Sequence, residues 1–130
     1  MAKILITEDE DALRIFVARA LKLDGHETVE AGDGAAGLEA LRDGAFDLLL
    51  SDIRMPVMDG ISLLRRIRAE PSDVPVIAFT GNLGEEQRHE LQNLGVRRIL
   101  AKPFLYEEFA DAVSTALGAG HVERRPANTR

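Results

Sequence analysis

The chain contains no cysteine and no tryptophan, and it has one tyrosine among its 130 residues. The absence of cysteine excludes disulfide bonds and thiolate metal sites, and it suits a protein of the reducing cytoplasm. No apolar run approaches the roughly 18 residues that a membrane span requires. The first residues enter a strand-like run without the layout of a signal peptide. We therefore expect a cytoplasmic protein that has no membrane partner.

The composition provides enough apolar material for one core. Hydrophobic residues make up 45% of the chain, which is an ordinary share for a globular domain. The net charge of −6 argues against nucleic acid as a partner. Residues 118–130 differ from the rest, because they carry three arginines and have Val122 as their only large apolar side chain. We predict a domain over residues 1–117, followed by a disordered tail over residues 118–130.

Apolar runs of strand length alternate with segments of helical periodicity. Strands are predicted at residues 4–6, 27–30, 47–51, 76–79 and 98–101, and helices at residues 11–23, 35–42, 61–67, 84–94 and 105–117. Five such strand–helix units predict an α/β fold with a doubly wound parallel sheet that is covered by helices on both faces. The run Leu48-Leu49-Leu50 is apolar on consecutive residues, as expected for a strand buried on both faces.

Two of these assignments concern individual residues. In the helix at 11–23, the spacing predicts a buried stripe that includes Phe16 and Leu21, with Ile15 and Ala18 on the opposite, exposed face. The last helix is predicted to end at Gly118.

Polar side chains follow the strands at the end where a parallel sheet binds ligands. Glu8 and Asp9 follow the first strand, Asp52 the third, Thr80 the fourth and Lys102 the fifth. Because ligands of open α/β sheets bind outside the carboxyl ends of the strands, we expect these groups to meet. Each alone has a simpler explanation, such as an acid pair at a helix start or a turn residue. Their combination in this order favours a site.

Neighbouring carboxylates need a counter-charge, and carboxylate and phosphate oxygens are ligands that Mg²⁺ prefers. Asp52 is the candidate nucleophile, because a carboxylate can accept a phosphoryl group as an aspartyl phosphate. Such a transfer depends on positioning and on neutralised charge, which Lys102 and the Thr80 hydroxyl can supply together with the metal.

These residues resemble those of a response-regulator receiver domain, the phospho-accepting half of bacterial two-component signalling. The resemblance covers residues 2–117 and rests on Glu8-Asp9, Asp52, Met55-Pro56-Val57-Met58-Asp59-Gly60, Thr80-Gly81 and Lys102-Pro103-Phe104. It implies a five-stranded flavodoxin-like sheet in which the strands have the order 2-1-3-4-5.

The resemblance also implies a role for each residue. Asp52 is similar to the phosphoacceptor, Thr80 to the switch hydroxyl and Lys102 to the phosphate-binding lysine, with a cis bond before Pro103. Glu8, Asp9, Asp52 and the main-chain carbonyl of Arg54 are similar to the Mg²⁺ ligands. Glu8 departs from the commoner aspartate. Ile99 stands where many relatives place an aromatic switch residue, so we expect the fourth helix to carry the response instead.

The implied partners are a sensor histidine kinase or a histidine phosphotransfer protein, with docking expected on the first helix. Too few residues follow the domain for a DNA-binding or catalytic output unit, so we expect a single-domain regulator that signals through an unidentified protein target. It would catalyse only its own phosphorylation and autodephosphorylation. Two alternatives stay open. One is a Mg²⁺-dependent phosphohydrolase, although Arg54 occupies the position of the second acid that such an enzyme needs. The other is a scaffold that does not respond to phosphate.

Overall fold

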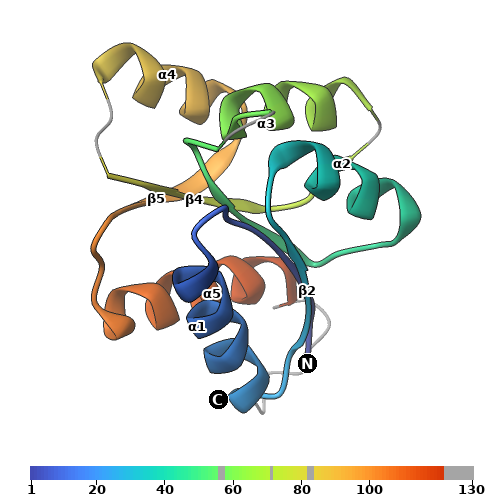
Figure 1. The fold of residues 1–130 in the computed structure, drawn as a ribbon, viewed down its shortest axis with the longest axis vertical. Helices are drawn as coiled ribbons and strands as arrows, with labels where there is room; N and C mark the ends of the chain where they lie inside the picture. Colours follow the sequence, from blue (N-terminus) through green and yellow to red (C-terminus); the bar gives the residue numbers. More distant parts are fainter. Residues whose placement is uncertain (56–57, 71, 82–83, 122–130) are drawn as a thin grey trace.

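The computed structural model describes residues 1–55, 58–70, 72–81 and 84–121, and the chain forms one five-stranded parallel sheet between two layers of helices (Figure 1). The strands are β1 (Lys3–Thr7), β2 (Glu27–Ala31), β3 (Leu48–Asp52), β4 (Val76–Thr80) and β5 (Val96–Ala101). Their order across the sheet is β2-β1-β3-β4-β5. The predicted fold class and strand order are confirmed.

The helices are α1 (Asp11–Leu23), α2 (Gly34–Asp43), α3 (Gly60–Ala69), α4 (Glu85–Asn93) and α5 (Tyr106–His121). Helices α1 and α5 cover one face of the sheet, and α2, α3 and α4 cover the other (Figure 1). None of the described helices is both long and apolar enough to cross a membrane.

Each face of the sheet has its own apolar core. The central strands β3 and β4 are buried along their whole length, as predicted for strands covered on both sides. On the α1–α5 face, Phe79, Phe104 and Phe109 pack together, with ring centroids 5.0 to 6.5 Å apart. These two cores hold the strands in register, so the polar ends of β1, β3, β4 and β5 come to one edge.

The helix boundaries have local causes. The side chains of Asp33 and Asp59 cap α2 and α3 by accepting hydrogen bonds from the backbone N–H groups of Ala36 and Ser62, each at 2.8 Å. Gly25 and Gly95 follow α1 and α4 with φ values of 91° and 84°, a conformation that favours glycine.

Two predictions about helices are wrong. Helix α1 turns the small Ala18 toward the sheet, where it is 2% exposed, whereas Phe16 is 53% exposed. The buried stripe is centred on Val17, Ala18 and Leu21, so the large side chain of Phe16 lies outside it. Helix α5 does not end at Gly118 but continues to His121, because glycine weakens a helix without forbidding it. The rest of the predicted tail, residues 122–130, lies outside the described residues.

Candidate metal and phosphoryl site

Three acidic side chains meet at the carboxyl edge of the sheet. Glu8, Asp9 and Asp52 each offer an oxygen, and these oxygens all lie within 4.8 Å of one another. Glu8 is fully buried, Asp52 is 4% exposed and Asp9 is exposed. They come together because β1 and β3 are parallel neighbours, with Thr7 opposite Ser51 in the register. The predicted acidic cluster is therefore present.

Lys102 lies against two of these acids. Its Nζ atom is 3.0 Å from Glu8 Oε1 and 3.2 Å from Asp52 Oδ2. Burial opposes the charge of Lys102, but the contacts with Glu8 and Asp52 outweigh it and leave the pKa of the lysine above its usual value. Lys102 therefore stays charged at neutral pH and neutralises part of the cluster.

Glu8 is the most constrained of the acids. Its Oε2 atom accepts a hydrogen bond from the Glu10 N–H at 3.0 Å. Its buried Oε1 atom is paired with the Lys102 ammonium and accepts no further hydrogen bond from the described residues. Burial raises the pKa of the Glu8 carboxyl to about 7, the negative charge of Asp52 adds to the rise, and Lys102 and the Glu10 N–H oppose it.

Asp52 is the last residue of β3 and is oriented from both sides. The Arg54 N–H donates to Asp52 Oδ1 at 3.2 Å. The main chain of Asp52 is held as well, because Thr7 Oγ1 donates to Ser51 Oγ at 2.7 Å and Ser51 Oγ donates to the Asp52 main-chain carbonyl at 2.9 Å. These buried hydroxyls satisfy each other and hold the end of β3 in place.

The remaining predicted residues are located as follows. Thr80 is the buried last residue of β4, and its carbonyl accepts a hydrogen bond from the Lys102 N–H at 2.7 Å. The bond between Lys102 and Pro103 is cis, as the resemblance implies. The Arg54 side chain is exposed, and the role of its carbonyl as a metal ligand stays a prediction.

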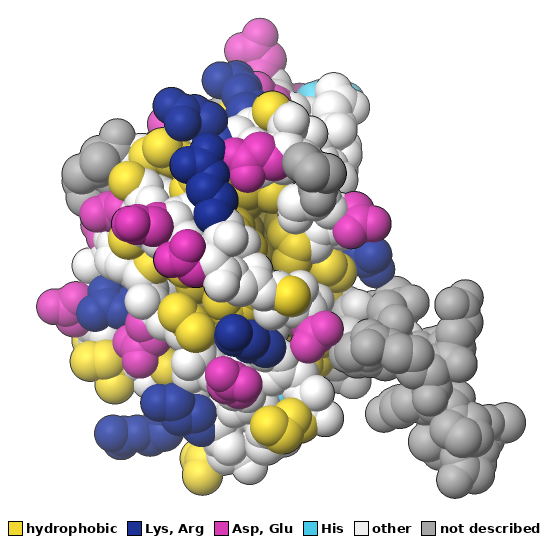
Figure 2. Space-filling view, turned by 90° about the vertical axis from the view of Figure 1, so that its right-hand side faces the viewer, with side chains coloured by type: hydrophobic (Ala, Val, Ile, Leu, Met, Phe, Trp, Pro, Cys, Tyr) yellow, Lys and Arg dark blue, Asp and Glu magenta, His cyan; other side chains and the backbone are white. Residues whose placement is uncertain are grey.

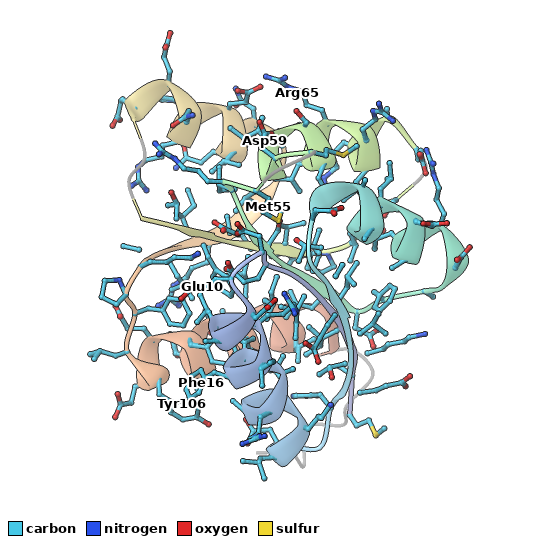
Figure 3. The ribbon with its side chains drawn as sticks, in the orientation of Figure 1. Glu10, Phe16, Met55, Asp59, Arg65 and Tyr106 are labelled. Atoms are coloured by element: carbon cyan, nitrogen blue, oxygen red, sulfur yellow. The ribbon has the colours of Figure 1, made fainter. Side chains whose placement is uncertain are left out.

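An open pocket of about 490 Å³ adjoins the acids. In Figure 3, Met55 and Asp59 lie near the edge of the sheet between Glu10 and α3. The pocket is lined by Asp9, Ile53, Arg54, Met55, Asp59, Ile61 and Gln87. Gln87 of α4 was not among the predicted site residues, and no motif marks it. The hydroxyls of Thr7 and Ser51 were also missed, although polar residues inside apolar strands are a readable signal.

The donor set fits Mg²⁺. The three acids offer oxygen ligands, the buried Glu8 Oε1 has no further hydrogen bond among the described residues besides its ion pair with Lys102, and the adjoining pocket leaves room for water and phosphate oxygens. A divalent cation and Lys102 together balance the three carboxylates. The acidic pocket is therefore compatible with a metal ion, which would supply charge neutralisation when bound.

Comparison with known proteins leads to the same family. Residues 4–114 match the response regulator receiver domain. The chain is 33% identical over 115 residues to sporulation initiation phosphotransferase F of Bacillus subtilis, covering 88% of this chain and 93% of that protein. It is 38% identical over 118 residues to the response regulator protein FleR of Pseudomonas aeruginosa, covering 90% of this chain and only 25% of FleR.

Solved structures agree with these sequence matches. The receiver domain of the Francisella response regulator 1452 superposes with a TM-score of 0.86 at 28% identity, covering 92% of this chain and 99% of that domain. Receiver domains generally are signalling domains rather than enzymes, and they act with histidine kinases or phosphotransfer proteins. On its fold, its acidic cluster and these matches, the chain belongs to the response regulator receiver domain family.

Proposed function

We propose that this receiver domain is a phosphorylation-dependent switch in which Asp52 accepts a phosphoryl group in the presence of Mg²⁺. The observation that supports the proposal most strongly is the meeting of Glu8, Asp9 and Asp52 with Lys102 at one edge of the sheet. An Asp52 oxygen forms a bond to phosphorus while the bond from phosphorus to a histidine nitrogen breaks, and that nitrogen recovers a proton. The protein thus catalyses only its own phosphorylation and autodephosphorylation.

The residues around Asp52 each have a part in this reaction. Lys102 stabilises the phosphoryl oxygens, since it already lies 3.2 Å from Asp52 Oδ2. Glu8, Asp9, Asp52 and the Arg54 carbonyl hold the cation, which supplies charge neutralisation when bound. The Thr80 hydroxyl binds the phosphoryl group, and α4 responds to this contact.

The donor is a sensor histidine kinase or a histidine phosphotransfer protein that docks on α1. Ile15 is 48% exposed, as predicted, and the neighbouring Phe16 is exposed as well. Figure 3 shows Phe16 of α1 and Tyr106 of α5 in the same half of the molecule, below the sheet. Exposed apolar side chains of this kind favour contact with another protein.

The target of the switch is another protein in the cytoplasm. Figure 2 shows acidic and basic side chains interspersed over the visible face, and the net charge is −6. This mixed and overall negative surface favours a protein target over nucleic acid.

Acetyl phosphate and Mg²⁺ test the proposal without a kinase. We expect the wild-type protein to gain the mass of one phosphoryl group, detected by intact-protein mass spectrometry, and the Asp52→Asn variant to gain none. Asp59→Asn is the matched control, because Asp59 lies near the same edge and asparagine can replace it as the helix cap. Equal labelling of the wild-type and Asp52→Asn proteins would contradict the proposal. Repeated turnover of a phosphoester would instead support a phosphohydrolase.

A further inference from the structure

Arg14 is a largely buried arginine beside the acidic cluster that the proposed reaction does not use. It lies in the second turn of α1, and its side chain is 17% exposed. Burial opposes its charge, but Asp11 and Glu30 outweigh that effect and leave the pKa of Arg14 above its usual value. Arg14 therefore stays charged, and its partners among the described residues hold it in place.

The guanidinium joins three segments of the chain. Its Nη1 atom donates to the Glu8 carbonyl at 2.9 Å, at the end of β1. Its Nε atom donates to Glu30 Oε1 at 3.2 Å, in the edge strand β2, and its Nη2 atom pairs with Asp11 Oδ1 at 2.8 Å within α1. A planar, forked cation can hold several acceptors in fixed directions, which an ammonium cannot do.

The contact with the Glu8 carbonyl fixes a particular peptide group. That peptide links Glu8 to Asp9, so its plane determines where the Asp9 side chain points. The opposite side of Glu8 is also held, because its N–H donates to the Ala31 carbonyl of β2 at 3.0 Å. Asp9 itself is exposed. The direction of its carboxylate therefore depends on the backbone that Arg14 holds.

We propose that Arg14, anchored by Glu30, is a positioning residue that sets the Glu8–Asp9 peptide so that the Asp9 carboxylate faces Glu8 and Asp52 for binding Mg²⁺. This role rests on the proposed function of the acidic site and adds a residue to it. Arg14 does not touch the cation or the phosphoryl group. It acts through the backbone of the acidic pair.

The direction in which Mg²⁺ affinity changes when Arg14 is replaced distinguishes a positioning role from a purely electrostatic one. Removing a positive charge near three carboxylates strengthens cation binding if charge alone matters. Removing a group that orients a ligand weakens it, typically by about tenfold or more for residues that support metal ligands. The two explanations thus predict opposite changes in Mg²⁺ affinity.

The test measures Mg²⁺ affinity directly by isothermal titration calorimetry, at a temperature where circular dichroism shows each variant to be folded. Arg14→Met keeps the aliphatic stem and loses the fork, and Arg14→Lys keeps the charge but loses the fork. Arg19→Met is the matched control, because Arg19 is an exposed arginine on the same helix. Glu30→Gln removes the anchor and leaves the arginine in place.

We expect about tenfold weaker Mg²⁺ binding in Arg14→Met and Arg14→Lys, a smaller weakening in Glu30→Gln, and wild-type affinity in Arg19→Met. Phosphorylation by acetyl phosphate should need more Mg²⁺ in the Arg14 variants and approach the wild-type rate when Mg²⁺ is saturating. Unchanged or tighter Mg²⁺ binding in Arg14→Met overturns the inference. If Arg14→Met does not fold, unchanged affinity in Glu30→Gln overturns it. Failure of the wild-type protein to bind Mg²⁺ refutes the proposed function instead.

Discussion

The raised pKa of Glu8 gives a testable relation between pH, Mg²⁺ and stability. The ordinary pKa of this carboxyl is 4.5, and burial raises it to about 7 in the folded protein. The folded state therefore binds the proton more tightly than the unfolded state does. The contribution of Glu8 to the free energy of unfolding is highest below pH 4.5, falls as the pH rises toward 7, and is then constant.

The size of the effect follows from the shift. One pH unit corresponds to about 1.4 kcal/mol, so the full change amounts to about 3 kcal/mol between pH 4.5 and pH 7. The pKa of Lys102 is also raised, but that group loses its proton only at much higher pH and does not contribute in this window. Glu8→Gln imitates the protonated carboxyl at every pH and should remove the effect.

Urea unfolding of the wild-type and Glu8→Gln proteins from pH 5 to pH 8, with a chelator present, provides the measurement. We expect the stability of the wild-type protein relative to the variant to fall by up to about 3 kcal/mol over this range. Saturating Mg²⁺ should stabilise the wild-type protein more at pH 8 than at pH 5, because the cation needs the ionised carboxylate. A stability difference that is flat or rises with pH in the chelator would refute the reasoning.

Three further predictions concern docking, response and packing. Ile15→Glu should slow phosphotransfer from a histidine donor and leave the reaction with acetyl phosphate unchanged. Leu23→Glu, at the exposed far end of α1, is the control and should alter neither reaction. Equal slowing with both donors in Ile15→Glu would exclude α1 as the docking site. Amide exchange in residues 84–95 should slow after phosphorylation. Leu91 is the one fully buried side chain among the described residues of α4, so the local stability of this helix is low and can increase. Unchanged exchange would exclude α4 as the responding element. Gly60→Ala should lower the free energy of unfolding by about 1–3 kcal/mol in urea denaturation, because the added methyl group would collide with the carbonyl at the end of β3. Gly81→Ala, where a methyl group meets open space, should have a much smaller effect, and an equal loss in both variants would contradict the packing argument.

The sheet and the acidic edge were predictable because both depend on order along the chain. Strand-length apolar runs that alternate with helical segments allow few topologies, and the residues that follow the strands must meet at one edge. Glu8, Asp52 and Lys102 were therefore identifiable without coordinates. The burial of individual helix residues was harder to predict. The helical spacing of apolar residues predicted that Phe16 is buried and Ala18 exposed, whereas in the structure Ala18 packs toward the sheet and Phe16 is exposed.

The contacts of Arg14 and Gln87 were not predictable in the same way. Arg14 reaches Glu30, which is 16 residues away along the chain, and that contact exists only because β2 lies beside β1 in the sheet. Gln87 reaches the pocket only through the way α4 packs on the sheet. Both depend on tertiary geometry that no local pattern in the sequence encodes.

Helix α4 is attached to the molecule mainly at one end. Leu91 enters the core, Glu90 pairs with Arg65 of α3, and the Leu94 carbonyl accepts a hydrogen bond from Arg68 at 2.8 Å. Residues 85–89, in the half that begins nearest β4, are exposed. The contacts of α4 among the described residues are thus concentrated at its C-terminal end, near β5. A change at Thr80 therefore reaches first the half of α4 that has the fewer buried contacts, while the contacts of Glu90, Leu91 and Leu94 hold the other half.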